Sequence, residues 1–181
     1  MIELSLHIMD IVENSVRAGA EVVAISVDAD TKADILNISI IDNGRGMSGD
    51  ELAEAVDPFV TTKPGKKTGL GLSLLRAAAR QTGGDLAITS VPGQGTAVDV
   101  RFGLTHVDRQ PLGNIKELML LLLVSHPRVE FQLSCSRDGE EFEWDTSTIY
   151  ERFGAVSRTK PDVMAFVRDQ LCSIESIDNQ E

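Results

Sequence analysis

The chain has 181 residues, 42% of them hydrophobic, and a formal net charge of −11 at pH 7. This composition predicts a globular protein with one ordinary domain and a small addition, and it excludes a disordered or fibrous chain. The negative charge argues against general nucleic-acid binding, which needs a basic surface. No apolar run reaches the roughly 20 residues of a membrane-spanning helix, and no signal peptide is visible.

The first predicted element is a helix over about residues 3–19. Polar side chains recur along one of its faces at steps of three and four: His7, Asp10, Asn14 and Arg17. An apolar stripe lies beside that face: Leu4, Ile8, Ile11 and Ala18. The polar face either turns to water or aims its carboxylate, amide and guanidinium at a single bound ligand.

Two strands rich in β-branched residues follow, over about 22–27 and 35–41, and we expect them to pair as a hairpin. A glycine-spaced turn at 42–47 then leads into a short helix near 49–55. Ser48 is the predicted N-cap of this helix, supported by an acidic residue three positions later.

A polar loop at 58–68 precedes a helix from 69 to about 82, which ends at a pair of glycines. Two more strands, over 86–91 and 96–102, flank a tight glycine-containing turn. These elements complete a layer of helices and sheet over about residues 1–103.

Positive charge gathers in one window of the sequence. Residues 58–84 contain no Asp or Glu, and their basic residues are Lys63, Lys66, Lys67, Arg76 and Arg80. Such an island in an acidic chain favours a polyanionic small ligand. A solvated basic loop is the alternative.

Three glycine-bearing segments are expected on one side of the sheet: 42–47, 68–72 and 93–96. In the first, Asp42 stands at a strand end, where its carboxylate can accept a hydrogen bond from the exocyclic amine of adenine. The neighbouring glycines leave room for the ring. In the second, unpaired amides at a helix N-terminus favour phosphate. The preceding lysines are long enough to reach β- and γ-phosphates.

The first helix offers groups for a metal and for proton transfer. Asn14 has an amide oxygen suited to Mg²⁺, a hard cation that prefers oxygen ligands. Asp10 lies one turn earlier, where it can orient water or a hydroxyl.

Together these segments resemble the histidine-kinase-like ATPase superfamily, which unites sensor histidine kinases, gyrase B subunits, MutL proteins and the ninety-kilodalton heat-shock chaperones. The segment 10–20 is similar to the N box, 42–47 to the first glycine box and 68–72 to the second. The segment 93–96 is similar to the last glycine signature of kinase members, and 57–63 resembles their phenylalanine box and the start of the ATP lid.

The resemblance implies a fold and a pair of cofactors. The implied fold is an α+β, two-layer sandwich of the Bergerat type, in which helices cover one face of a mixed sheet. The implied cofactors are ATP and Mg²⁺, with Asn14 as metal ligand, Asp42 on adenine and Arg17 near phosphate. The other nucleotide-binding positions that it implies are Gly44, Gly46, Met47, Phe59, Thr62, Lys63, Thr68, Gly69, Leu70, Gly71, Leu72 and Thr96.

The resemblance supports hydrolysis less directly. Asp10 matches the position of the general-base Glu in gyrase and MutL members, but it is one methylene shorter. An error of about 1 Å in placing the attacking water can cost about 100-fold in rate. We interpret His7 as a helix-surface residue or a neighbour of the nucleotide site rather than as a phospho-acceptor.

The second half of the chain carries no catalytic motif that we recognise. We expect a linker at 104–112, a small α+β domain at 113–172 and a disordered tail at 173–181. The predicted domain contains a strongly apolar helix at 115–124, whose leucine run we assign to the core, with an exposed partner site as the alternative.

Two strands and a final helix complete this predicted domain. The strands, over 129–134 and 141–144, are joined by a turn at 137–139. The final helix begins near Pro161 and runs to about Cys172. The chain has two cysteines, Cys135 and Cys172, which are too few for a disulfide framework. We therefore expect two structural thiols and a cytoplasmic protein.

We expect neither the two-helix phospho-acceptor segment of sensor kinases nor the second domain of MutL and gyrase members. The chain is therefore interpreted as a stand-alone, kinase-type catalytic domain that acts on a partner protein in trans. The alternatives are a nucleotide-responsive protein-binding module and a slow ATPase without phosphotransfer. The expected partners are ATP and an unidentified protein, with a homodimer left open and with neither nucleic acid nor a membrane.

Overall fold

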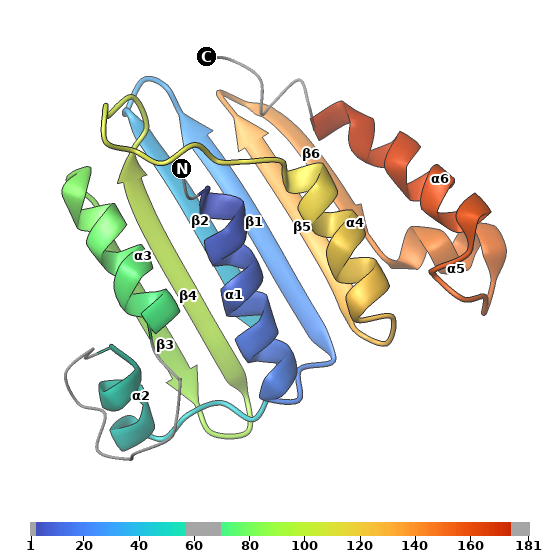
Figure 1. The fold of residues 1–181 in the computed structure, drawn as a ribbon, viewed down its shortest axis with the longest axis horizontal. Coiled ribbons are helices and arrows are strands. Elements are labelled where there is room, and N and C mark those ends of the chain that lie inside the picture. The colour runs from blue at the N-terminus through green and yellow to red at the C-terminus, as the bar shows by residue number, and fades with distance from the viewer. Residues whose placement is uncertain (1–2, 57–69, 175–181) are drawn as a thin grey trace.

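The computed structural model of the protein describes residues 3–56 and 70–174. Helices and strands alternate irregularly along the chain, as Figure 1 shows. In chain order they are α1 (Leu4–Arg17), β1 (Val22–Asp30), β2 (Ile35–Asp42), α2 (Gly49–Val56), α3 (Leu70–Gln81), β3 (Asp85–Val91), β4 (Gly95–Gly103), α4 (Ile115–Ser125), β5 (Glu130–Arg137), β6 (Glu140–Asp145), α5 (Ser147–Phe153), α6 (Pro161–Gln170) and the 3₁₀-helix η1 (Leu171–Ile174).

The described strands form one six-stranded sheet in the order β3-β4-β2-β1-β5-β6. Only β1 and β5 pair in parallel among the described neighbours, and the other pairs are antiparallel. The helices α1, α3 and α4 lie on one face of this sheet (Figure 1). The predicted fold class, an α+β sandwich with a mixed sheet covered on one face, is therefore confirmed.

Alternation of side chains explains why one face is covered. Along β1 the buried apolar residues are Val23, Ile25, Val27 and Ala29, and along β2 they are Leu36, Ile38 and Ile40. Side chains alternate between the two faces of a strand, so these residues point to the helices. The apolar stripe of α1 packs onto them, with Leu4 and Val12 fully buried.

Local signals placed most helix and strand ends within one or two residues. The predicted cap of α2 is present, because the Glu51 amide donates to the Ser48 hydroxyl and the Ser48 amide donates to the Glu51 carboxylate. The predicted hairpin turn between β5 and β6 is also present, with positive φ angles at Asp138 and Gly139.

The second half of the chain extends the same sheet. Because β5 pairs with β1, and β6 pairs with β5, the strands expected in a separate domain at 113–172 share one sheet and one apolar core with the first half. The linker at 104–112 is tied to the first turn of α1, since the amides of Leu4 and Ser5 donate to the carbonyls of Pro111 and Leu112. The division into two domains stays a prediction.

The apolar helix α4 packs between α1 and α6. Leu118, Met119, Leu120, Leu122 and Leu123 are buried, which confirms the assignment of the leucine run to the core except at Leu121, which is 48% exposed. Its length is also too short for a bilayer, and none of the described helices is long and apolar enough to cross one.

Two expectations at the C-terminal end were incomplete. Helix α5 was not predicted, because its Ser, Thr, Ile, Tyr and Phe residues have weak helix propensity. Ser173 and Ile174, expected in a disordered tail, belong to η1, which continues directly from α6. The loop at 58–68 and residues 175–181 lie outside the described residues.

Candidate nucleotide site

A buried carboxylate stands at the end of β2. Asp42 is 8% exposed and points to the face of the sheet that carries α1. The Ser15 hydroxyl of α1 donates to its Oδ2 at 2.6 Å, and the Gly44 amide donates to its Oδ1 at 2.8 Å. Each oxygen thus has one donor within the protein and keeps lone pairs with which to accept a further hydrogen bond.

Polar side chains continue from Asp42 across the neighbouring strands. Thr96 of β4 is paired with Asp42 on one side and with Ser90 of β3 on the other. The hydroxyl oxygens of Thr96 and Ser90 lie 2.8 Å apart, and the Met47 amide donates to the Ser90 hydroxyl at 2.8 Å. The structure therefore brings three predicted positions, Asp42, Met47 and Thr96, to one end of the sheet.

The glycine turn after β2 is held by backbone contacts. The Gly93 amide donates to the Arg45 carbonyl at 2.7 Å, and the Arg45 amide donates to the Ala18 carbonyl at 2.9 Å. A Cβ on Gly46 would lie 2.0 Å from the Val91 carbonyl oxygen. The sequence predicted that Gly46 leaves room for the adenine ring. In the structure a glycine is needed at this position because its backbone contacts β3.

The polar face of α1 is only partly exposed. Asp10, Asn14 and Arg17 are exposed, whereas His7 is 6% exposed. Its assignment to the helix surface was therefore wrong, and the alternative, a neighbour of the nucleotide site, stays a prediction. His7 lies about one turn before Asp10 on α1. None of the described residues partners its Nε2 atom.

The first turn of α3 lies against Asp10. A Cβ built on Gly71 would stand 3.5 Å from the Asp10 Oδ2 atom, at ordinary contact distance. Leu72 packs against the core, and the α3 backbone begins at Leu70. The exposed carboxylate of Asp10, the amide of Asn14 and the N-terminus of α3 therefore lie close together.

The donor set is suited to a hard cation held jointly with a ligand. No group of three or more His, Cys, Asp or Glu side chains that could hold a metal occurs among residues 3–56 and 70–174. Mg²⁺ is usually bound by one or two protein oxygens together with phosphates and water rather than by a complete protein cage. Asn14, one turn from Asp10, fits that limited role.

The expected positive island is partly neutralised. Arg76 and Arg80 both contact Asp85 at 3.1 Å, at the far end of α3 from Gly71. The hydrogen bonds from Arg80, from the Leu86 amide and from Arg76 hold the pKa of Asp85 well below its usual range. Asp85 therefore balances part of the positive charge of these two arginines, and the polyanion interpretation of the island stays a prediction.

Several predicted positions lie outside the described residues. They are Phe59, Thr62, Lys63, Thr68 and Gly69, together with Lys66 and Lys67 of the island. Their expected roles stay predictions.

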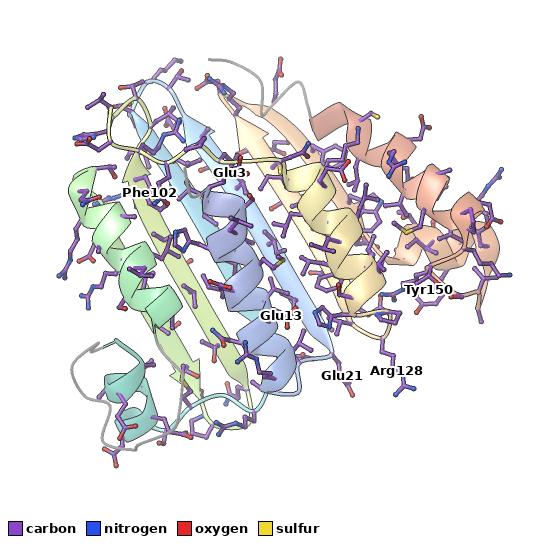
Figure 2. All side chains as sticks on the ribbon, viewed as in Figure 1. Glu3, Glu13, Glu21, Phe102, Arg128 and Tyr150 are labelled. Atoms are coloured by element: carbon purple, nitrogen blue, oxygen red, sulfur yellow. The ribbon has the colours of Figure 1, made fainter. Side chains whose placement is uncertain are left out.

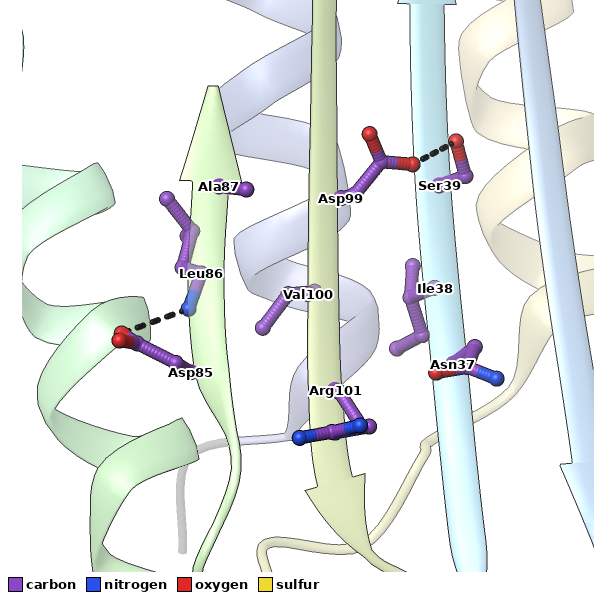
Figure 3. Close-up of a pocket in the computed structure, with 9 residues that line it drawn as sticks. All are labelled: Asn37, Ile38, Ser39, Asp85, Leu86, Ala87, Asp99, Val100 and Arg101. Atoms are coloured by element: carbon purple, nitrogen blue, oxygen red, sulfur yellow. Dashed lines mark hydrogen bonds between the residues drawn. The ribbon is translucent and has the colours of Figure 1, made fainter. Parts of the chain in front are cut away.

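A shallow hollow of about 350 Å³ lies on the other face of the sheet (Figure 3). Asn37, Asp99 and Arg101 line it, and Asp99 accepts a hydrogen bond from Ser39 at 2.7 Å. Because the Asp42 carboxylate points to the opposite face, this hollow is not part of the candidate site.

Sequence reasoning missed three residues that shape the site. Ser15 and Ser90 contact the predicted positions directly, and the Asn43 side chain accepts hydrogen bonds from the amides of Glu21 and Val22. A signal for Ser15 was present, because it stands on the apolar stripe of α1, four residues after Ile11. A serine at such a position has to find a polar partner when it is buried.

Comparisons with known proteins agree with this arrangement. The family model described as histidine kinase-, DNA gyrase B-, and HSP90-like ATPase matches residues 2–106. An uncharacterized sensor-like histidine kinase of Rhizobium meliloti (strain 1021) is 37% identical over 81 residues, which cover 42% of this chain and 15% of that protein. The matches span between 12% and 24% of the length of the curated relatives, so the chain corresponds to a small part of each.

Two solved structures share the fold. The N-terminal domain of a DNA repair protein matches with a TM-score of 0.59 and 16% identity, over 86% of this chain and 58% of that chain. The Aquifex aeolicus MutL ATPase domain complexed with ADP matches with a TM-score of 0.51 and 18% identity, over 92% of this chain and 68% of that chain.

Proposed function

Because the chain belongs to the histidine kinase-, DNA gyrase B-, and HSP90-like ATPase family, we propose that it binds ATP with Mg²⁺ and transfers the γ-phosphoryl group to a partner protein. The nucleotide would lie between α1 and the end of the sheet at β2 and β4. The observation that carries this proposal is the buried carboxylate of Asp42, held by α1 at the end of β2.

Asp42 supports the choice of adenine over guanine. An ionised carboxylate only accepts hydrogen bonds. The exocyclic amine of adenine can donate to it, whereas guanine offers a carbonyl oxygen at the corresponding ring position. A mismatch at a desolvated polar group costs far more than the loss of an apolar contact.

The phosphate end of the nucleotide would lie toward Asn14 and α3. Anions are favoured at a helix N-terminus by unpaired amides and by the helix dipole, and Asp10 lies beside the first turn of α3. Bound Mg²⁺ would neutralise phosphate charge, with the Asn14 amide oxygen as its protein ligand. Asp10 would orient a water molecule or an attacking group.

The histidines of the chain support transfer to another molecule. His7 is buried, and His106 lies beyond β4. His126 lies 2.7 Å from Glu13, which Figure 2 shows on the side of α1 toward α4. None of these three histidines is both exposed and beside Asp10 and the first turn of α3, where the phosphates would lie. An acceptor on a partner protein is therefore the simplest source of a phosphorylated side chain.

Incubation with γ-labelled ATP tests the proposed reaction. The chain would be mixed with Mg²⁺ and with a cell lysate or proteins encoded beside it, and labelled proteins would be separated on a gel. Label on a partner that disappears with the Asp42→Ala variant is the expected result. Label found only in inorganic phosphate would exclude phosphotransfer.

A slow ATPase is the second candidate, and the position of Asp10 favours it. Its carboxylate is exposed and lies beside the first turn of α3, where it would be able to orient water. Phosphate release that is lost in Asp10→Asn, with no labelled partner, would support this function. A nucleotide-responsive binding module is the outcome if ATP changes a protein contact without release of phosphate.

A further inference from the structure

The buried serine of α1 makes the contact from which a further role follows. Ser15 is 3% exposed, and its Oγ lies 2.6 Å from Asp42 Oδ2 and 3.3 Å from the Ile11 carbonyl oxygen. A hydroxyl has one proton to donate. The shorter contact falls in the range of charge-assisted O–H···O⁻ bonds, so the proton goes to Asp42 rather than to the helix backbone.

The two donors on Asp42 come from different parts of the chain. Ser15 belongs to α1, whereas the Gly44 amide belongs to the turn after β2. The last torsion of an aspartate is broad and roughly two-fold, so a single donor leaves the plane of the carboxylate loosely set. A donor on each oxygen fixes that plane, and therefore fixes where the remaining lone pairs point.

We propose that Ser15 is a positioning residue for base recognition, which holds the Asp42 carboxylate in the orientation that accepts the exocyclic amine of adenine. This inference rests on the proposed function. It also places base recognition and metal binding on consecutive residues of one helix, because Asn14 is exposed and Ser15 is buried.

Two nucleotides distinguish this role from a purely structural one. ATP carries the exocyclic amine, and purine riboside 5′-triphosphate lacks it while keeping the ring, sugar and phosphates. Calorimetric titrations with Mg²⁺ would compare the wild-type chain with Ser15→Ala. Ser15→Ala is expected to weaken ATP binding about tenfold, the effect of a lost hydrogen bond to a charged group, and to leave binding of the amine-free nucleotide unchanged.

The matched control is Ser5→Ala. Ser5 is also a buried serine of α1, but its hydroxyl contacts Glu3 and not Asp42. This variant is expected to bind both nucleotides as the wild type does. In an Asp42→Ala background, Ser15→Ala is expected to cause no further loss of ATP affinity.

If Ser15→Ala lowers the affinity for both nucleotides equally, or for neither, the inference is overturned. The proposal that the wild-type chain binds ATP would still stand. A wild-type chain that binds neither nucleotide would instead remove the proposed function. If Ser15→Ala does not fold, Ser15→Cys keeps a weak donor in the same place. It is expected to show a smaller loss that is again confined to ATP, and an equal loss for both nucleotides would overturn the inference.

Discussion

Gly46 and Val91 touch so closely that a Cβ on Gly46 would lie 2.0 Å from the Val91 carbonyl oxygen. This contact joins the turn after β2 to the end of β3, and Gly46 makes it with a φ angle of +66°. The glycine box of the sequence is thus also a packing device. It fixes the turn that carries Asp42 against the β3–β4 hairpin.

Gly46→Ala should therefore destabilise the protein more than another glycine substitution nearby. Gly93 has a φ angle of +77° and open space around its Cβ position. Gly93→Ala should therefore lower the free energy of unfolding only by the cost of the left-handed backbone conformation, about 1–2 kcal/mol. Gly46→Ala adds a backbone clash and should cost more than about 3 kcal/mol. Urea denaturation of both variants measures the difference, and equal costs would show that the turn shifts freely.

Asp42→Asn should alter the choice of base. The amide keeps one acceptor oxygen but replaces the other with a donor, which can reach the carbonyl oxygen of guanine. ATP affinity should fall about tenfold or more, and the preference for ATP over GTP should shrink. Asp99→Asn is the matched control, because Asp99 also accepts a serine hydroxyl but lies on the open face of the sheet. Competition against a fluorescent nucleotide gives both affinities, and an unchanged preference in Asp42→Asn would contradict the assignment.

Asn14→Ala should remove the effect of Mg²⁺ on ATP binding and leave the metal-free affinity unchanged. Mutation of a residue that only contacts a metal ligand lowers the metal affinity roughly 10–100-fold. Loss of the ligand itself should therefore lower the metal affinity at least about tenfold. Titrations with Mg²⁺ and with a chelator separate the two affinities. Asn37→Ala, the same substitution on the open face, should behave as wild type. A loss in Asn14→Ala that is equal with and without Mg²⁺ would exclude the metal role.

Asp85 should make stability depend on pH at the acidic end. Arg80, the Leu86 amide and Arg76 lower the pKa of Asp85 in the folded protein. Its charged form therefore adds stability above the unfolded pKa of about 3.9, and this stability is lost as the pH falls toward the lower folded value. The melting temperature of wild type minus that of Asp85→Asn should be constant above about pH 5.5 and shrink below about pH 4. A difference that does not change down to pH 3 would argue that the two arginines do not hold the carboxylate.

Local patterns in the sequence were enough to predict most of the first half. Alternating Val and Ile residues gave β1 and β2, the Ser48 cap gave the start of α2, and glycines marked the end of α3. The same signals placed Asp42 and Thr96 at strand ends, although their pairing joins strands that are far apart in the sequence. The other features depend on neighbours in the sequence, and such signals are short-range.

Long-range contacts could not be predicted in the same way. The parallel pairing of β1 with β5 joins segments more than 100 positions apart, as at Val22 and Glu130, and no local pattern specifies it. The contact of Ser15 with Asp42 spans 27 positions. Asp85 stands just outside the basic window, so its ion pairs with Arg76 and Arg80 became evident only from the packing of α3 on β3.

The central claim is that an adenine nucleotide binds beside Asp42 with its phosphates toward Asn14. Calorimetric titration of the wild-type chain with ATP and with GTP, each with and without Mg²⁺, tests this most directly. One ATP should bind per chain, more tightly with Mg²⁺, and GTP should bind at least about tenfold more weakly. Equal affinity for ATP and GTP, or no heat of binding with ATP, would contradict it.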